Sequence, residues 1–203
     1  MWVRKGLSVE IRSSAMIRIS DDDPDYVIKV AYPFLECRAR VAWEYRMLVD
    51  IERLSVPLPV VRARGSALED SQGVFAFRLE KLQEWNDGVH LCRSMHAATR
   101  ALHQRGICHN DLRQPNLMRR GKDPVLIDFE TAGYIGNEVP DYLNITAKRF
   151  SVTEDIAALK EIGAFTMIDE VVSTVRGFCW RARSLLNKLS SWGGRSSDIA
   201  KLN

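Results

Sequence analysis

The stretch "ICHNDLRQPNLM", from Ile107 to Met118, decides the fold assignment of this sequence. It places Asp111 and Asn116 five residues apart in one predicted loop, and Asp128 follows twelve residues later at the end of an apolar run. A hairpin between the two segments would bring the three side chains to one end. Oxygen ligands of this kind suit Mg²⁺, which takes one or two carboxylates together with substrate phosphates. A further carboxylate at the same place can orient and deprotonate an attacking hydroxyl.

Length and composition bound the class of protein. The chain has 203 residues, 46% hydrophobic and 27% charged, which is the balance of a soluble globular protein with one domain or two small lobes. The net charge is +3 and the basic residues are spread out, so we expect no direct nucleic-acid binding. No apolar run reaches about 18 residues, so we expect no membrane span. The four cysteines form no CxxC pair, which favours free thiols in a cytoplasmic or nuclear protein.

Hydrophobic periodicity predicts an α+β unit over roughly the first 80 residues. Alternating and β-branched runs predict five strands, at residues 8–11, 16–20, 26–30, 60–69 and 73–82. Apolar residues three and four apart predict a helix over 35–54, which the prolines of "VPLPV" end. The remaining predicted elements are a helix over 89–105 stopped by Gly106, a short strand over 124–130, two helices between 152 and 190, and a flexible tail.

The motif "HNDLRQPN" followed by "LIDFE" resembles the catalytic loop and metal-binding turn of the protein-kinase-like superfamily, whose patterns are H-R-D-L-x-x-x-N and D-F-G. By this resemblance Asp111 is the catalytic base, and Asn116 and Asp128 bind the metal ions. Arg113 lies where many protein kinases carry a lysine that contacts the transferred phosphate, and its charge can serve the same purpose.

The same resemblance assigns a nucleotide site to the first part of the chain. Lys29 in "YVIKV" is similar to the strand lysine that holds the α- and β-phosphates of ATP, and Glu44 in "WEYRML" to the helix glutamate that positions it. The turn of the phosphate-binding loop and the adenine-binding hinge are implied at Ser13, Ser14, Glu80 and Leu82. Asp155 in "TEDIAAL" is implied to brace the catalytic loop.

Each of these residues, taken alone, has a structural interpretation. Asp111 and Asn116 can be turn formers, Lys29 a solvated edge charge, and Asp155 a helix N-cap. His109 is interpreted as a packed residue that supports its loop. The order and spacing of the whole set favour the functional interpretation.

Three departures from the superfamily pattern stand out. The glycine-rich loop is absent and "EIRSSAMIRI" takes its place, which leaves nucleotide affinity open. Asn110 replaces the arginine that often pairs with a phosphorylated activation loop, so we expect no such switch. Glu130 replaces the glycine of D-F-G, while the aspartate that binds metal is retained.

The resemblance implies a two-lobed fold, with an N-lobe at residues 1–82 and a reduced helical C-lobe at 83–203, similar to small RIO-like or lipopolysaccharide-kinase-like members. It implies an ATP- and Mg²⁺-dependent phosphotransferase that moves the γ-phosphate to a hydroxyl. A protein serine or threonine is narrowly favoured over a small-molecule acceptor. The alternatives are a pseudokinase that acts as a binding module, and a small-molecule kinase of the aminoglycoside or choline kinase type, which usually carries a larger substrate lobe.

Overall fold

The computed structural model describes residues 10–11, 14–19, 23–54, 56–88 and 90–163. The chain divides into two compact units, residues 1–162 and 163–203, and everything below concerns the first. The helices predicted towards residue 190 and the predicted tail lie outside the described residues, apart from helical turns at 153–163. The predicted lobe boundary after residue 82 stays a prediction.

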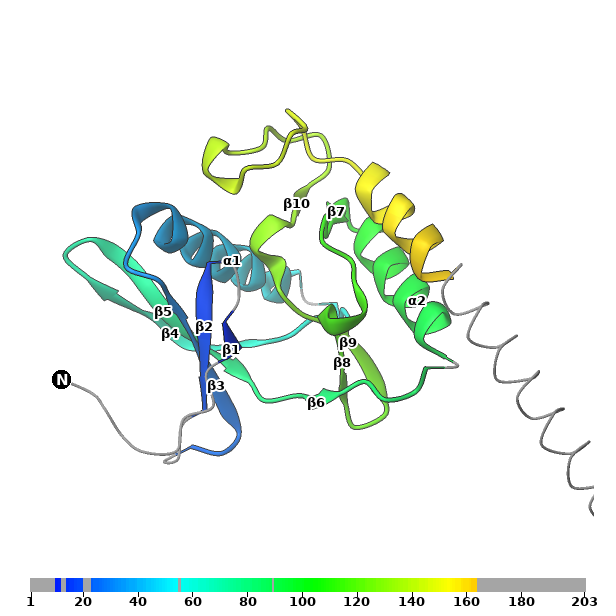
Figure 1. Ribbon diagram of the computed structural model, residues 1–203, viewed down its shortest axis with the longest axis horizontal. Coiled ribbons are helices and arrows are strands. Elements are labelled where there is room, and N and C mark those ends of the chain that lie inside the picture. The colour runs from blue at the N-terminus through cyan, green and yellow to red at the C-terminus, as the bar shows by residue number, and fades with distance from the viewer. Residues whose placement is uncertain (1–9, 12–13, 20–22, 55, 89, 164–203) are drawn as a thin grey trace, which may run out of the picture. The chain divides into compact units, whose positions relative to one another are not determined.

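A five-stranded antiparallel sheet forms the first part of the described chain, in the order β1-β2-β3-β5-β4 (Figure 1). The β-branched residues of "YVIKV" explain why the third strand forms. At Gly73 the backbone has a φ of 96°, which glycine adopts without strain, and this turn closes the last hairpin. The strands are β1 (Glu10–Ile11), β2 (Ala15–Ile19), β3 (Tyr26–Ala31), β4 (Ala63–Asp70) and β5 (Gly73–Glu80). The predicted sheet of five strands is confirmed.

Helix α1 (Leu35–Arg53) packs against β5. Its buried residues Val41, Glu44, Leu48 and Ile51 recur every three or four positions, so they form one face of the helix. Glu44 is the exception on this apolar face, because it is a fully buried carboxylate. Burying a charge is costly unless the charge is paired, so the position of Glu44 requires a partner inside the protein.

Helix α2 (Leu91–His103) and two small antiparallel sheets make up the rest of the described chain. One sheet has the order β6-β8-β9 and the other pairs β10 with β7. Gly106 follows α2 with a φ of 71°, consistent with its predicted role as a stop signal. The elements are β6 (Gln83–Glu84), β7 (Ile107–Cys108), η1 (Gln114–Asn116), β8 (Leu117–Arg120), β9 (Asp123–Leu126), η2 (Phe129–Thr131), β10 (Gly133–Tyr134) and η3 (Asp141–Leu143).

The strand predicted through Glu130 is shorter than expected. The hairpin between the two motif segments is present as the β8–β9 pair, but its pairing stops at Leu126. Asp128 then adopts a left-handed conformation with a φ of 68°, and the short 3-10 turn η2 follows. In a continuous strand the side chains would alternate between the two faces. Here the turn changes the direction of the backbone at Asp128, whose side chain accepts a hydrogen bond from Lys29. Aspartate tolerates the left-handed region better than most residues.

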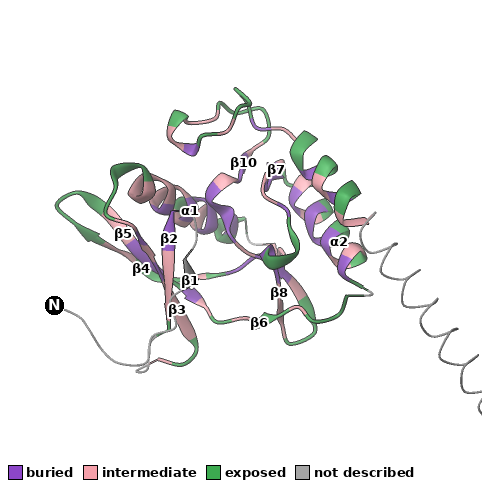
Figure 2. Ribbon diagram, in the orientation of Figure 1, coloured by how far each residue is buried: buried purple, intermediate pink, exposed green. Residues whose placement is uncertain are grey.

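The hydrophobic core is formed by buried side chains of the five-stranded sheet, of α1 and of one face of α2 (Figure 2). Phe77, Phe129, Ile51 and Met95 are among its largest fully buried side chains. Several polar residues are buried as well, and they include the residues singled out in the sequence: Lys29, Glu44, His109, Asn116, Asp128 and Asp155. Within the described part of the chain, no helix combines the length and the apolar character that a membrane span requires.

Candidate active site

Lys29 lies at the centre of a buried cluster of charges. Its Nζ is 2.5 Å from Oε2 of Glu44 on α1 and 2.7 Å from Oδ1 of Asp128. Oε2 of Glu130 lies 3.9 Å from the same nitrogen. Strand β3, helix α1 and the turn after β9 therefore meet at one lysine. Lys29 is the partner that the buried carboxylate of Glu44 requires.

Three carboxylates around one ammonium set the protonation of this cluster. Burial alone would lower the pKa of Lys29, but Glu44, Asp128 and Glu130 outweigh it and raise the pKa above its usual value. Burial raises the pKa of Glu44 to about 7, against the opposing effect of Lys29. Lys29 is therefore a cation at neutral pH. The excess of negative charge around it favours a bound cation nearby.

Asp111 is held by the side chains of its own loop. The Nδ2 of Asn116 donates to the backbone oxygen and to Oδ2 of Asp111, at 2.9 Å each. Nη2 of Arg113 lies 3.1 Å from Oδ2 of Asp111 and 3.8 Å from Oδ2 of Asp128. The loop aspartate and the turn aspartate thus both lie near the same guanidinium nitrogen. Burial raises the pKa of Asp111, while Arg113 and His109 oppose the rise.

Asn116 and Asp128 offer oxygen atoms that fit a hard cation. Asn116 is fully buried, its nitrogen is committed to Asp111, and its Oδ1 has no hydrogen-bond partner among the described residues. A buried acceptor without a partner is costly, which indicates a ligand that the protein atoms do not supply. In the described part of the chain no three His, Cys, Asp or Glu side chains form a metal cluster. A cation here would therefore complete its shell with water and phosphate oxygens, as Mg²⁺ commonly does.

Asp155 holds the loop through hydrogen bonds to its backbone, as the resemblance implied. Its Oδ2 accepts from the amide of His109 at 2.9 Å, and its Oδ1 from the amide of Asn110 at 2.7 Å. His103 of α2 lies 2.8 Å from the same carboxylate. His109 is fully buried, packs against Phe129 and contacts the backbone oxygen of Ile127 at 2.9 Å, so it joins the loop to the segment after β9.

We expect Asp155→Ala to lower the free energy of unfolding by about 3 kcal/mol, because it leaves the buried amide of His109 and the part-buried amide of Asn110 without acceptors. Urea unfolding followed by circular dichroism measures the difference. Glu154→Ala is the matched control, since Glu154 is exposed on the same helical turn. Equal stability of the two variants would contradict the bracing role.

An apolar cavity of about 250 Å³ opens beside Lys29. Its walls come from the five-stranded sheet, the β6-β8-β9 sheet and the segments next to them, and its charged residues include Lys29 and Asp128 of the cluster. Mainly apolar walls with a few charged groups are typical of small-molecule sites. Two residues predicted for the adenine hinge, Glu80 and Leu82, line it. The other lining residues are Ile17, Ile19, Val27, Lys29, Glu44, Val61, Leu79, Lys81, Glu84, Met118, Ile127 and Asp128.

Glu80 is engaged within the protein rather than free for a ligand. Its amide donates to the backbone oxygen of Arg62 at 3.1 Å, and its Oε1 accepts from the amide of Arg62 at 2.8 Å. Two guanidinium nitrogens of Arg120, Nε and Nη2, donate to the same carboxylate. The amide of Lys81 donates to Asp25 at 2.8 Å. Leu82 is accordingly the better candidate of the two for contact with a nucleotide.

The turn that replaces the glycine-rich loop reaches Glu130. Ser14 is buried, and its hydroxyl donates a short hydrogen bond to Oε2 of Glu130. Ser13 lies outside the described residues. The glutamate that breaks the D-F-G pattern thus contacts both the β1–β2 turn and Lys29, a role that the sequence alone did not suggest.

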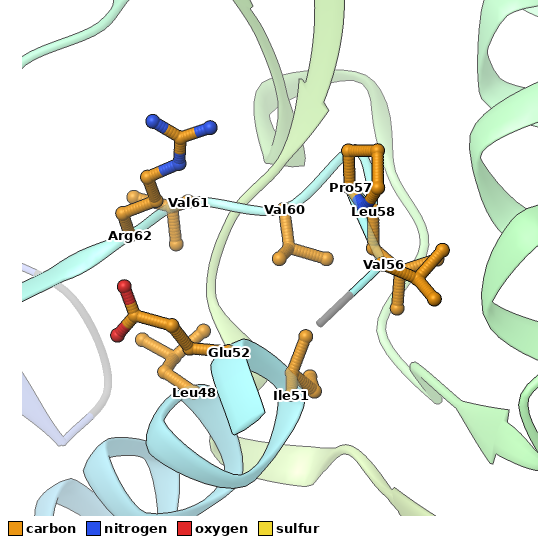
Figure 3. Close-up of a pocket in the computed structure, with 9 residues that line it drawn as sticks. All are labelled: Leu48, Ile51, Glu52, Val56, Pro57, Leu58, Val60, Val61 and Arg62. Atoms are coloured by element: carbon orange, nitrogen blue, oxygen red, sulfur yellow. The ribbon is translucent and has the colours of Figure 1, made fainter. Parts of the chain in front are cut away.

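A second cavity, of about 230 Å³, lies at the end of α1 (Figure 3). Leu48 and Ile51 of the helix face the segment from Val56 to Arg62 across it. Among the described residues that line it, Glu52 and Arg62 are the charged ones, and neither belongs to the Lys29 cluster.

Sequence reasoning missed the apolar walls of the first cavity. Ile17 and Ile19, like Val27 and Lys29, are two residues apart on their strands, so each pair shares one face of the sheet. That period-two pattern is present in the sequence. Because Lys29 was predicted to lie in the site, the pattern indicated that Val27 faces the same site. Met118 and Ile127 carried no such signal, because the β8–β9 hairpin brings them to the cavity from the other side.

Two comparisons with known proteins found a match. A sequence model of the phosphotransferase enzyme family (APH) matches residues 90–135, the region that contains Asp111, Asn116 and Asp128. The solved structure of the Cydia pomonella granulovirus kinase PK-1 matches 75% of this chain with a TM-score of 0.54, at 13% sequence identity. The chain has a protein-kinase-like fold. It spans 66% of the viral kinase's length, and a search of curated proteins finds no match.

Proposed function

We propose that this protein is a phosphotransferase that uses ATP and Mg²⁺ and moves the γ-phosphate to a hydroxyl. The observation that carries the proposal is the buried set of Lys29, Glu44 and Asp128, next to a buried Asn116 oxygen that has no partner among the described residues. A purely structural lobe gains nothing from burying so many charges, because replacing them with apolar residues is often neutral or stabilising.

The residues divide the work of phosphoryl transfer among them. Lys29 would hold the α- and β-phosphates, with Glu44 fixing its position through the 2.5 Å contact. Asp128 and Asn116 would hold Mg²⁺, which when bound neutralises charge on the phosphate oxygens. Asp111 would accept a hydrogen bond from the attacking hydroxyl and take up its proton. The apolar cavity ending at Leu82 would take the adenine.

Arg113 supports Asp111 and the transferred phosphate together. One nitrogen of its guanidinium lies near both aspartates, and its charge opposes the rise that burial causes in the pKa of Asp111. When a phosphate is transferred past it, the same cation can stabilise the charge that develops on the equatorial oxygens.

For the acceptor we propose a protein serine or threonine, with a small-molecule hydroxyl as the alternative. Incubation with labelled ATP and Mg²⁺ separates them when one arm contains a protein lysate and the other a protein-free set of small alcohols and amino sugars. Asp128→Ala is the control in both arms. Label that appears only in the second arm would overturn the choice of acceptor but not the proposed chemistry.

Binding of ATP is tested first, by thermal shift. Binding to the native state alone stabilises by about 2.7 kcal/mol at a ligand concentration of 100 Kd, so millimolar ATP with Mg²⁺ should raise Tm by several degrees. An unchanged Tm at that concentration would favour the pseudokinase alternative. The absence of a glycine-rich loop in the sequence is an argument for that alternative.

The pH dependence of transfer should follow Asp111. Because burial raises the pKa of this carboxyl, we expect the acid limb of the kcat profile to lie above the range of an exposed aspartate. Removing the cation in Arg113→Ala removes an effect that lowers this pKa, so the limb should move to higher pH. Arg113→Lys keeps the charge and is the control, and a limb that stays in place in Arg113→Ala would contradict Asp111 as the titrating group.

A further inference from the structure

Helix α1 is fastened to residues 131–152, the segment that follows the metal-binding turn. The indole nitrogen of Trp43 donates to the backbone oxygen of Ala132 at 2.8 Å. Its ring stacks on Phe150 with centroids 6.0 Å apart and an interplanar angle of 12°, and it meets the edge of Tyr142 at 6.4 Å. One side chain of the helix therefore contacts the segment at its start, its middle and its end.

Arg40 makes the second attachment, one turn earlier on α1. Its Nε donates to the backbone oxygen of Tyr142 at 3.0 Å, and its Nη2 to that of Leu143 at 3.1 Å. Its Nη1 lies 3.9 Å from Oε1 of Glu130, the acid that also lies beside Lys29. Arg40 and Glu44 are four residues apart, so they lie on the same side of the helix.

The segment itself is seated tightly. Phe150 is 2% exposed, and its ring lies over Gly133, where a Cβ atom would come within 2.4 Å of it. Gly133 pairs with Cys108 of β7, directly before the catalytic loop. At the start of the segment, the Nδ2 of Asn110 donates to the backbone oxygen of Thr131 at 3.2 Å. Asn110, which replaces the regulatory arginine of the superfamily pattern, thus contacts the segment through the backbone oxygen of Thr131.

We propose that Arg40 and Trp43 are positioning residues that keep α1 in the arrangement where Glu44 meets Lys29, without phosphorylation of residues 131–152. Their partners in the segment are backbone oxygens and aromatic rings, and Arg40 also lies near Glu130. All of these groups are part of the unmodified chain, whereas a phosphorylation-dependent anchor needs an added charge. We call Arg40, Trp43, Tyr142 and Phe150 the α1 clasp. The inference rests on the proposed function for its kinetic consequences, but not for the attachment itself.

The kinetic test uses the full chain and four variants. In Arg40→Ala and Trp43→Ala we expect kcat to fall about tenfold, as the loss of one or two hydrogen bonds by a positioning residue would produce, with KM for ATP changed less than about twofold. Trp43→Phe keeps the stacking and should recover most of kcat. Arg53→Ala is the control, because Arg53 lies at the exposed end of the same helix and outside the clasp. Unchanged kcat in both alanine variants would overturn the proposal.

A second measurement does not depend on activity. Hydrogen exchange followed by mass spectrometry should show faster exchange in α1 and in residues 138–150 of Arg40→Ala, with α2 unchanged. If the wild-type chain transfers no phosphate, the proposed function fails, and the exchange pattern still decides whether the clasp holds the helix. Exchange in α1 equal to wild type would overturn it.

Phosphatase treatment completes the test. Wild-type protein treated with a broad-specificity phosphatase should keep its full kcat, and Thr131, Tyr134, Tyr142, Thr146 and Ser151 should carry no phosphate in the active protein. Loss of activity on treatment, restored by phosphorylation of this segment, would show that the clasp is insufficient and would overturn the proposal.

Discussion

Asp111→Asn should lower kcat for phosphotransfer about a thousandfold, within the range that a positioned general base contributes. The asparagine oxygen can still accept the hydrogen bond from Asn116, so the loop should keep its shape. Because Asp111 is not among the residues lining the cavity beside Lys29, the affinity for ATP should change little. Steady-state kinetics with labelled ATP give the first quantity, and the thermal shift with ATP and Mg²⁺ gives the second.

The control for this variant is Asp123→Asn, an exposed aspartate at the start of β9 that does not line the cavity beside Lys29. It should leave both kcat and the thermal shift as in wild type. Asp111→Asn that turns over as fast as Asp123→Asn would remove Asp111 from the mechanism. If both ATP binding and turnover are lost, the variant has disturbed the Asn116 side of the site, and Asn116→Asp would then be compared.

The folding units of this protein were readable from local sequence patterns. The period-two alternation and β-branched residues predicted the five strands, and the three- and four-residue spacing predicted α1 within a residue of its observed end. The spacing of the kinase-like motif placed Asp111, Asn116 and Asp128 at one end of a hairpin, and the structure has that hairpin. These features depend on residues close in the chain, which a pattern can record.

The remaining features depend on residues that are far apart in the chain. Ser14 bonds Glu130 across 116 positions and Arg40 reaches Tyr142 across 102, and no periodicity reports such pairs. The contact between Glu80 and Arg120 is of the same kind, because it joins residues 40 positions apart. The left-handed conformation of Asp128 could not be predicted, because residues 124–130 have the pattern of a continuous strand. Only the contact with Lys29 distinguishes this position.

Lys29→Met should lower the free energy of unfolding by about 3 kcal/mol at pH 7, because breaking a buried ion pair leaves its partner charge uncompensated. Glu44 is fully buried and would keep the amide of Phe129, at 3.1 Å, but lose its cation. Denaturant unfolding measures the loss, and Lys122→Met, at an exposed turn, is the control.

The pH dependence of Lys29→Met has a definite sign. Without Lys29 the pKa of Glu44 rises further in the folded state, while in the unfolded chain it stays at its ordinary value. Between these two values the folded state binds more protons, so the variant should gain stability as pH falls towards the unfolded value and lose it as pH rises. A deficit relative to wild type that is the same at pH 5 and pH 8 would contradict this account.

The double variant Lys29→Met/Glu44→Leu separates stability from function. It replaces the buried pair with apolar groups of similar length, so more than half of the lost stability should return. The thermal shift with ATP should not return, because Leu and Met offer no charge to the phosphates. If ATP binding came back with stability, the Lys29–Glu44 pair would be a structural contact, and the nucleotide would have to be held by other residues of the cavity.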